Sequence, residues 1–201
     1  MSDTLVYPYR RGSLYINLTN ECGNSCLFCA RSHRIFRLGQ FDLGLTIEHG
    51  IDEYQQGIDS HIRDRGKPRE FVFCGYGEPT TRIRALLDLS QWIQKEYGGV
   101  IRLNTNGQTG LMWGKEYLHD LAAVVDRINV SLNAPDLSSY RRICRPVYDG
   151  DAWRHVVGFA RYMKDCEVDI WCSAVNIVLS VEELSALREF LRFLEIPLRI
   201  R

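Results

Sequence analysis

The sequence has no apolar run long enough to cross a membrane. Its longest charge-free apolar stretch, residues 170–181, is interrupted by Ser173, Asn176 and Ser180, and it falls well short of the ~20 apolar residues that a spanning helix needs. The first residues also lack the apolar segment of a secretory signal peptide. We therefore expect no membrane association and a cytoplasmic location.

An excess of charge of either sign is absent as well. The 201 residues carry 25 Lys and Arg against 25 Asp and Glu, so the formal net charge is zero. This balance excludes an overall electrostatic attraction to nucleic acid or to an anionic membrane. Internal repeats, low-complexity tracts and linkers are also lacking, and we expect one domain over residues 1–201.

The cysteines do not suit a disulfide framework. There are seven, an odd number, in a sequence without a signal peptide. Three of them, Cys22, Cys26 and Cys29, lie within eight residues. Because clustered cysteines in a reducing compartment usually bind metal, this segment predicts a metal site.

Apolar runs and helical periodicities alternate along the chain. We predict strands over residues 14–19, 70–74, 100–104, 127–132, 168–179 and 197–201, and helices over residues 46–64, 82–97, 115–125, 151–164 and 181–194. This alternation predicts an α/β fold with a parallel sheet covered by helices, either a barrel or an open sheet. In both, the chemistry belongs at the C-terminal ends of the strands, where polar and Gly-rich segments follow here.

The cysteine spacing is Cys-x3-Cys-x2-Cys, directly after the first predicted strand. A structural zinc site normally has four ligands, usually as two separated pairs, and no second pair follows. Three thiolates would leave one iron of a four-iron cluster without a protein ligand, open to a reacting cofactor. The alternative is a zinc-stabilised, non-catalytic binding module whose fourth ligand is His33 or a distant cysteine.

This motif, with Phe28 before its third cysteine, resembles the radical S-adenosylmethionine (SAM) superfamily. The resemblance implies a [4Fe-4S] cluster held by Cys22, Cys26 and Cys29, with SAM chelating its unique iron. It implies an enzyme, because reduction cleaves SAM to a 5′-deoxyadenosyl radical that abstracts hydrogen from a substrate. It also implies an external electron donor of the flavodoxin or ferredoxin type and a partial (β/α)6 TIM-like barrel of the radical SAM type.

A turn after the second predicted strand is similar to the superfamily motif that holds the SAM amino group. It reads Cys-Gly-Tyr-Gly-Glu-Pro over residues 74–79. Glycine lets backbone carbonyls approach a ligand closely, and a glutamate can accept a hydrogen bond from an amine. The resemblance assigns SAM contacts in this turn to Gly75, Tyr76, Gly77 and Glu78.

Three later segments are similar to the parts of the superfamily that contact the rest of SAM. Asn104 ends the third predicted strand and is assigned to the ribose. Ser131 and Asn133 are two residues apart on the fourth, so they share one strand face. Asn176, on the fifth, would lie near adenine. The residues that act on the substrate stay unassigned.

The match extends to the TatD-associated radical SAM proteins, which the motifs at strands two to four and the final Pro-Leu-Arg-Ile-Arg resemble. That resemblance implies a TatD-type nuclease as a partner. An alternative function is therefore modification of nucleic acid or a nucleotide beside the nuclease, with Arg31, Arg34 and Arg37 binding phosphate. The neutral charge and the lack of a nuclease motif favour an unidentified substrate instead.

The predicted barrel has an open side. Six strands are fewer than the eight that close a barrel of this type, so we expect a lateral gap covered by the substrate, by residues 30–45 or by another protein. Arg199 and Arg201 alternate on the last predicted strand and point to one side. There they could meet an anionic group.

Overall fold

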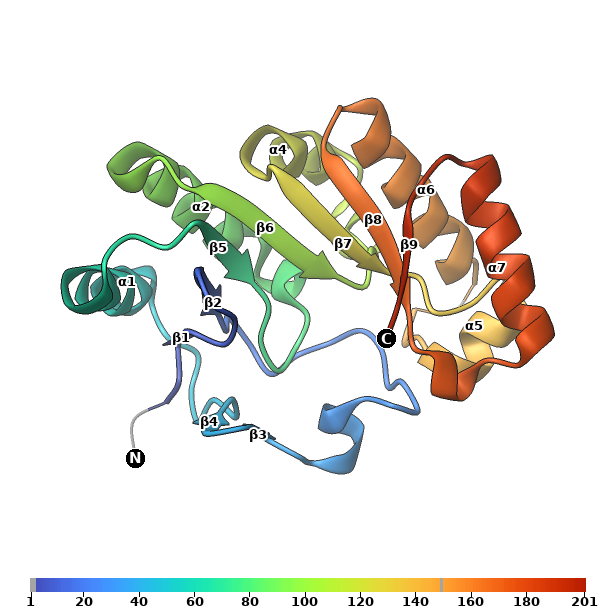
Figure 1. The fold of residues 1–201 in the computed structure, drawn as a ribbon, viewed down its shortest axis with the longest axis horizontal. Helices are drawn as coiled ribbons and strands as arrows, with labels where there is room; N and C mark the ends of the chain where they lie inside the picture. The colour runs from blue at the N-terminus through green and yellow to red at the C-terminus, as the bar shows by residue number, and fades with distance from the viewer. Residues whose placement is uncertain (1–2, 149) are drawn as a thin grey trace.

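The computed structural model describes residues 3–148 and 150–201 and contains a mostly parallel seven-stranded sheet (Figure 1). In spatial order, its strands are β1 Val6–Tyr7, β2 Ser13–Ile16, β5 Glu70–Phe73, β6 Val100–Thr105, β7 Arg127–Ser131, β8 Asp169–Ala174 and β9 Leu198–Ile200. Only β1 pairs antiparallel with its neighbour in this sheet. The predicted α/β fold and its six parallel strands are confirmed.

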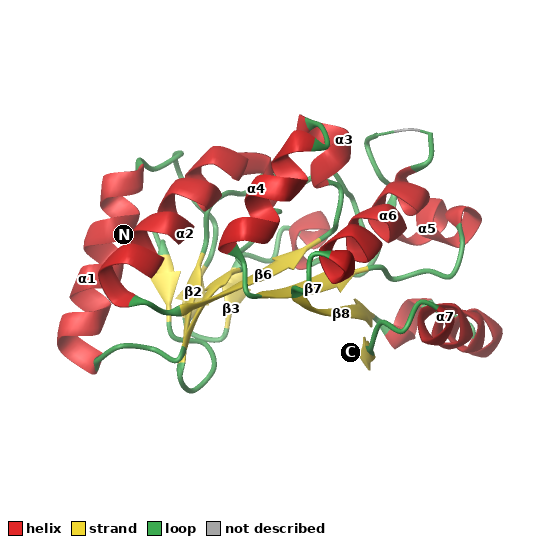
Figure 2. Cartoon of the chain, turned by 90° about the horizontal axis from the view of Figure 1, so that it is seen from above, coloured by secondary structure: helices red, strands yellow, loops and turns green. Residues whose placement is uncertain are grey.

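Helices cover one face of the sheet. They are α1 Ile51–Arg65, α2 Ile83–Tyr97, α3 Thr109–Trp113, α4 Glu116–Val124, α5 Leu137–Cys144, α6 Ala152–Asp165 and α7 Val181–Phe193. Figure 2 shows α1, α2, α4 and α6 on the same side. Helical spacing places Ile83, Leu86, Leu89 and Ile93 of α2 on one stripe, and all four are almost fully buried in the core between the layers.

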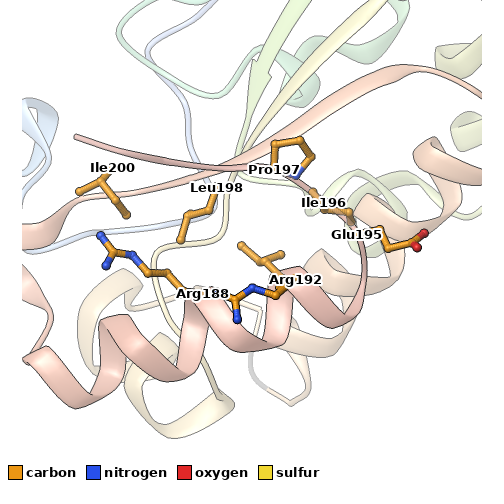
Figure 3. A pocket seen from close by; sticks show the side chains of 8 residues that line it. Arg188, Arg192, Glu195, Ile196, Pro197, Leu198 and Ile200 are labelled. Atoms are coloured by element: carbon orange, nitrogen blue, oxygen red, sulfur yellow. The ribbon is translucent and has the colours of Figure 1, made fainter.

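The sheet does not close on itself. β1 and β9 stand at the two ends of the strand order and do not pair with each other, so the structure is a partial barrel with the expected lateral gap. On the helix side of β9, Leu198 and Ile200 face Arg188 of α7 across a cavity of about 460 Å³ that Arg192 also lines (Figure 3). Because strand side chains alternate, Arg199 and Arg201 lie on the opposite, concave face.

The strand predicted over residues 168–179 is too long. β8 ends at Ala174, and the apolar residues beyond it include a 3-10 helix, Asn176–Val178. Its backbone is satisfied locally, since the Leu179 N–H donates to the Asn176 carbonyl at 3.1 Å. Apolar composition alone does not separate such a turn from a strand.

Residues 30–45, where the sequence predicts no helix or strand, contain short regular elements. They contain a 3-10 helix, Ala30–His33, and a short antiparallel hairpin of β3 Arg37–Leu38 and β4 Phe41–Asp42. The sequence pattern does not indicate α3 or α5 either, because each has too few residues to show a clear helical period. Among the described residues, no helix is both long enough and apolar enough to span a membrane.

Candidate functional site

The turn that follows β5 is hydrogen-bonded to the segment that follows β2. The Gly77 N–H donates to the Thr19 carbonyl at 2.9 Å, and the Glu78 N–H donates to the Glu21 carbonyl at 2.7 Å. These bonds continue the parallel pairing of β2 with β5 beyond the strands themselves. The turn therefore lies directly beside the segment that leads into Cys22.

The two glycines of this turn leave no room for a side chain. A Cβ on Gly77 would lie 2.6 Å from the Thr19 carbonyl oxygen and would also clash with that of Glu21. A Cβ on Gly75 would lie 2.7 Å from the Asn17 Cα. The sequence assigns these glycines to close approach of a ligand, whereas the structure shows that the packing of two backbone segments requires them.

We expect Gly77→Ala to lower the melting temperature, because the atoms that its Cβ meets are backbone and cannot swing aside. Overpacking of this kind typically costs about 1–3 kcal/mol. A matched control is Gly158→Ala in α6, where an added Cβ meets no atom within 4 Å. The control should gain up to about 1 kcal/mol of stability from helix propensity. Thermal unfolding measures both, and equal melting temperatures would contradict the packing argument.

Glu78 is buried at the centre of the turn, with 4% of its surface exposed. Its Oε1 accepts hydrogen bonds from the Thr80 N–H at 3.1 Å, the Thr80 hydroxyl at 2.8 Å and the Thr105 hydroxyl at 2.7 Å. Its Oε2 accepts one from the Asn106 N–H at 2.6 Å. The carboxylate therefore connects the end of β5 to the end of β6.

This role differs from the one that the sequence predicts, in which Glu78 mainly serves a ligand amine. The four protein donors lower the pKa of Glu78, but burial raises it by more. No ion pair with another described residue neutralises the carboxylate. The Glu78 carboxyl group lies close to Cys22 and, after burial, helps to raise the pKa of that thiol.

The cysteine loop, residues 22–29, is fastened to α5. Four backbone hydrogen bonds join it to the end of this helix and the residues that follow. Among them, the Ser25 N–H donates to the Cys144 carbonyl at 3.1 Å and the Leu27 N–H to the Ile143 carbonyl at 3.0 Å. Figure 1 shows the segment between β2 and β3 running past the C-terminal ends of β5, β6 and β7.

Two buried side chains outside this loop, Gln108 and Tyr140, form hydrogen bonds with its Asn24 side chain. The Gln108 Nε2 donates to the Asn24 Oδ1 at 2.8 Å and to the Tyr140 hydroxyl at 2.9 Å. The Asn24 Nδ2 also donates to the Tyr140 hydroxyl, at 3.3 Å. Sequence reasoning misses this network, because its members come from three distant segments and carry no spacing signal.

The thiols lie in different electrostatic surroundings. The Cys22 Sγ accepts hydrogen bonds from the Asn24 N–H at 3.4 Å and from the Asn106 Nδ2 at 3.8 Å, while burial raises the pKa of Cys22 to about 12. A hydrogen bond with Cys144 lowers the pKa of Cys26 and raises that of Cys144. N–H donors to sulfur are among the contacts that tune iron–sulfur clusters.

The donor set fits a three-thiolate cluster. Cys22, Cys26 and Cys29 are each half-buried on one loop. Among the described residues, no three His, Cys, Asp or Glu side chains lie close enough to hold a single metal ion. A four-iron cluster can take its thiolates on separate irons, so it accepts a wider set. His33, the possible zinc ligand, already has its Nε2 2.9 Å from the Leu27 carbonyl.

Two aromatic residues assigned to SAM have protein partners of their own. Phe28 is half-buried and packs against the main core. Tyr76 stacks on Phe36, with ring centroids 4.8 Å apart and an interplanar angle of 27°. Its hydroxyl donates to the Arg31 carbonyl at 3.5 Å. Residues 30–45 therefore fold back over the turn that carries Tyr76.

Of the remaining assigned residues, Asn104 and Ser131 lie at the concave face of the sheet, whereas Asn133 and Asn176 lie beyond the ends of β7 and β8. Asn104 lines a cavity on the concave face, and the Ser131 hydroxyl, near it, accepts a hydrogen bond from Arg201 at 3.2 Å. The expectation that Ser131 and Asn133 share a strand face is wrong, because β7 ends at Ser131 and Asn133 is left-handed, with φ of 51°. Asn176 is exposed in the 3-10 helix after β8 and does not line this cavity.

Solved structures with this fold include SAM-bound proteins. SuiB of Streptococcus suis, bound to S-adenosylmethionine, is 17% identical with a TM-score of 0.71, over 94% of this chain and 40% of SuiB. A radical SAM methyltransferase from Sphaerobacter thermophilus is 17% identical with a TM-score of 0.60, over 94% and 65%. The protein anSMEcpe, with bound AdoMet and a peptide, is 15% identical with a TM-score of 0.66, over 92% and 49%. Such identities show a shared fold, and the chain spans less than two thirds of each.

A family profile carries the assignment further. No curated protein matches the chain in sequence, but the profile of the radical SAM superfamily matches residues 16–194. The matched region includes the cysteine loop, the 74–78 turn and the parallel strands from β5 to β8. The chain therefore belongs to the radical SAM superfamily, a family of enzymes that use a [4Fe-4S] cluster and S-adenosylmethionine.

Proposed function

We propose that this chain cleaves SAM reductively at a [4Fe-4S] cluster held by Cys22, Cys26 and Cys29. When bound, the cluster and SAM supply the radical chemistry: one electron cleaves SAM to methionine and a 5′-deoxyadenosyl radical, which takes a hydrogen atom from the substrate. The observation that carries the proposal is the junction at Asn106. Its N–H binds the Glu78 carboxylate and its side chain binds the Cys22 sulfur.

At this junction, a cationic ligand group bound by Glu78 would lie beside a cluster bound by Cys22. Glu78 is a buried carboxylate without a cation, so the ammonium group of SAM is a suitable partner for it and for the carbonyls of the turn from Gly75 to Gly77. Asn104 and Ser131 would bind the polar groups of SAM that extend over the sheet. We also propose SAM contacts from Phe28, Tyr76, Asn133 and Asn176.

We further infer that residues 1–201 act as one radical SAM core domain. The electron comes from an external donor, of the flavodoxin or ferredoxin type, and the protein acts in the cytoplasm. We also propose that the chain belongs to the TatD-associated group and has a TatD-type nuclease as its partner. The substrate is otherwise unassigned.

The test is the formation of 5′-deoxyadenosine. Protein reconstituted anaerobically with iron and sulfide, then reduced with dithionite, should release 5′-deoxyadenosine from SAM slowly even without substrate. A brown protein with iron and acid-labile sulfide that forms this product supports the proposal. A colourless protein that retains zinc, with no product, would establish the binding module instead.

A further inference from the structure

The concave face of the sheet contains a cavity of about 340 Å³, and Asn104 is the one proposed SAM contact among the described residues that line it. Side chains from before β2, from β2 and from each strand from β6 to β9 line it. Those that matter here are Tyr15, Arg10, Arg102, Asn104, Asn129, Trp171, Ser173, Arg199 and Arg201. A cavity of this size is at the small end of small-molecule sites.

Strand register places these side chains in layers. Asn104 pairs with Asn129, which pairs with Trp171. One step toward the C-terminal ends, Ser173 pairs with Arg199. Since alternate residues share a face, these side chains point into the cavity, whereas Leu198 faces α7 (Figure 3).

The cavity is cationic. Four arginines line it, and no Asp or Glu side chain of the described residues does. Arg102 is neutralised in part by Glu70 at 3.1 Å. Arg199 and Arg201 have uncharged partners instead: the Arg199 guanidinium lies 3.9 Å from the Trp171 ring centroid, and the Arg201 Nη2 donates to Ser131. Neither guanidinium forms an ion pair with another described side chain.

Buried polar atoms in the cavity lack partners. Asn129 is 6% exposed and Ser173 is 2% exposed, yet the Asn129 Oδ1 and the Ser173 hydroxyl make no hydrogen bond within the described structure. The same holds for the Asn104 Oδ1. An unsatisfied buried polar group is destabilising, so several of them around one cavity point to a polar ligand.

We propose that this cavity binds the substrate, and that the substrate is a small molecule carrying an anionic group, either a carboxylate or a phosphate. Arg199 and Arg201 bind the anion, and Asn129 and Ser173 hydrogen-bond the neutral polar part. This inference rests on the proposed function, because it places the substrate on the sheet face below the strand ends where SAM would bind.

The test is equilibrium binding of two simple anions to the full chain. Inorganic phosphate and succinate are titrated calorimetrically, with sodium chloride at equal ionic strength as the reference. The variant is Arg199→Met, an exposed edge residue whose loss leaves no carboxylate unpaired. Its matched control is Arg63→Met, an exposed arginine on α1 away from the cavity. We expect about a tenfold loss of anion affinity in Arg199→Met, as for one charge-assisted contact, and none in the control.

Tighter binding of phosphate supports a phosphate ester as the substrate, and tighter binding of succinate supports a carboxylate. Binding no stronger than that of chloride, or an equal loss in the Arg63→Met control, overturns the inference. It is also overturned if SAM displaces the anion and Arg199→Met weakens SAM binding by the same factor, because the arginine would then serve the SAM carboxylate. Failure to cleave SAM while anion binding persists counts against the proposed function alone.

Discussion

Cys26→Ala protein, reconstituted anaerobically with iron and sulfide, should lose the cluster of about four irons that the wild-type chain holds. In the proposed site each of three irons has one cysteine thiolate, and removal of one thiolate would leave two irons without a protein ligand. Iron content, acid-labile sulfide and the broad absorption near about 400 nm report the loss together. The same result is expected for alanine at Cys22 and at Cys29.

Two other cysteines serve as controls for this result. Cys166 is exposed at the end of α6, and Cys166→Ala should retain all of the iron. Cys144 is the sharper control, because it is buried and hydrogen-bonded to Cys26. Cys144→Ala should also keep the cluster. Loss of metal from it would make Cys144 a fourth ligand and would favour the zinc site; full iron in Cys26→Ala would end the cluster hypothesis.

Glu78→Gln should both destabilise the fold and weaken SAM binding. Each carboxylate oxygen faces a backbone N–H, that of Thr80 on one side and that of Asn106 on the other. Whichever way the amide is turned, its NH₂ therefore meets a donor, at a cost of about 1–3 kcal/mol. Loss of the negative charge also removes a charge-assisted contact with the SAM amine, so SAM affinity should fall by about one to two orders of magnitude.

Separate measurements distinguish the two effects. Thermal unfolding without SAM reports the buried hydrogen bonds, and equilibrium SAM binding well below the melting temperature reports the ligand contact. Glu96→Gln, at a half-exposed position on α2, is the matched control and should change neither. A lower melting temperature with unchanged SAM affinity would leave Glu78 as a residue of the turn and remove it from the SAM site.

The succession of strands and helices along the chain could be predicted from the sequence, because apolar runs and helical periods are local signals. The 74–78 turn and the cysteine loop could also be found, since their residues are adjacent in the chain. What escapes is pairing across distance. β1 has two residues and gains its identity only from β2, and α5 is recognisable as the support of the cysteine loop only when the fold brings it there.

The roles of individual residues within the candidate site were harder to predict than their locations. Spacing alone does not show that the missing Cβ of Gly77 makes room for the Thr19 backbone, or that Asn133 leaves the strand in a left-handed conformation. Trp171 and Ser173 illustrate the same limit. They belong to an ordinary apolar strand until register sets them beside Asn129 and Arg199.

The hydrogen bonds between the cysteine loop and α5 contribute to the ordering of the loop backbone. Ordering a residue costs about 1–2 kcal/mol, and the hydrogen bonds to Cys144, Ile143 and their neighbours offset part of this cost for the loop backbone. In zinc fingers the metal supplies the folding free energy and the apoprotein is unfolded. In this chain the loop is also joined to the rest of the fold, so we expect the protein to stay folded when the cluster is lost and to accept a new cluster.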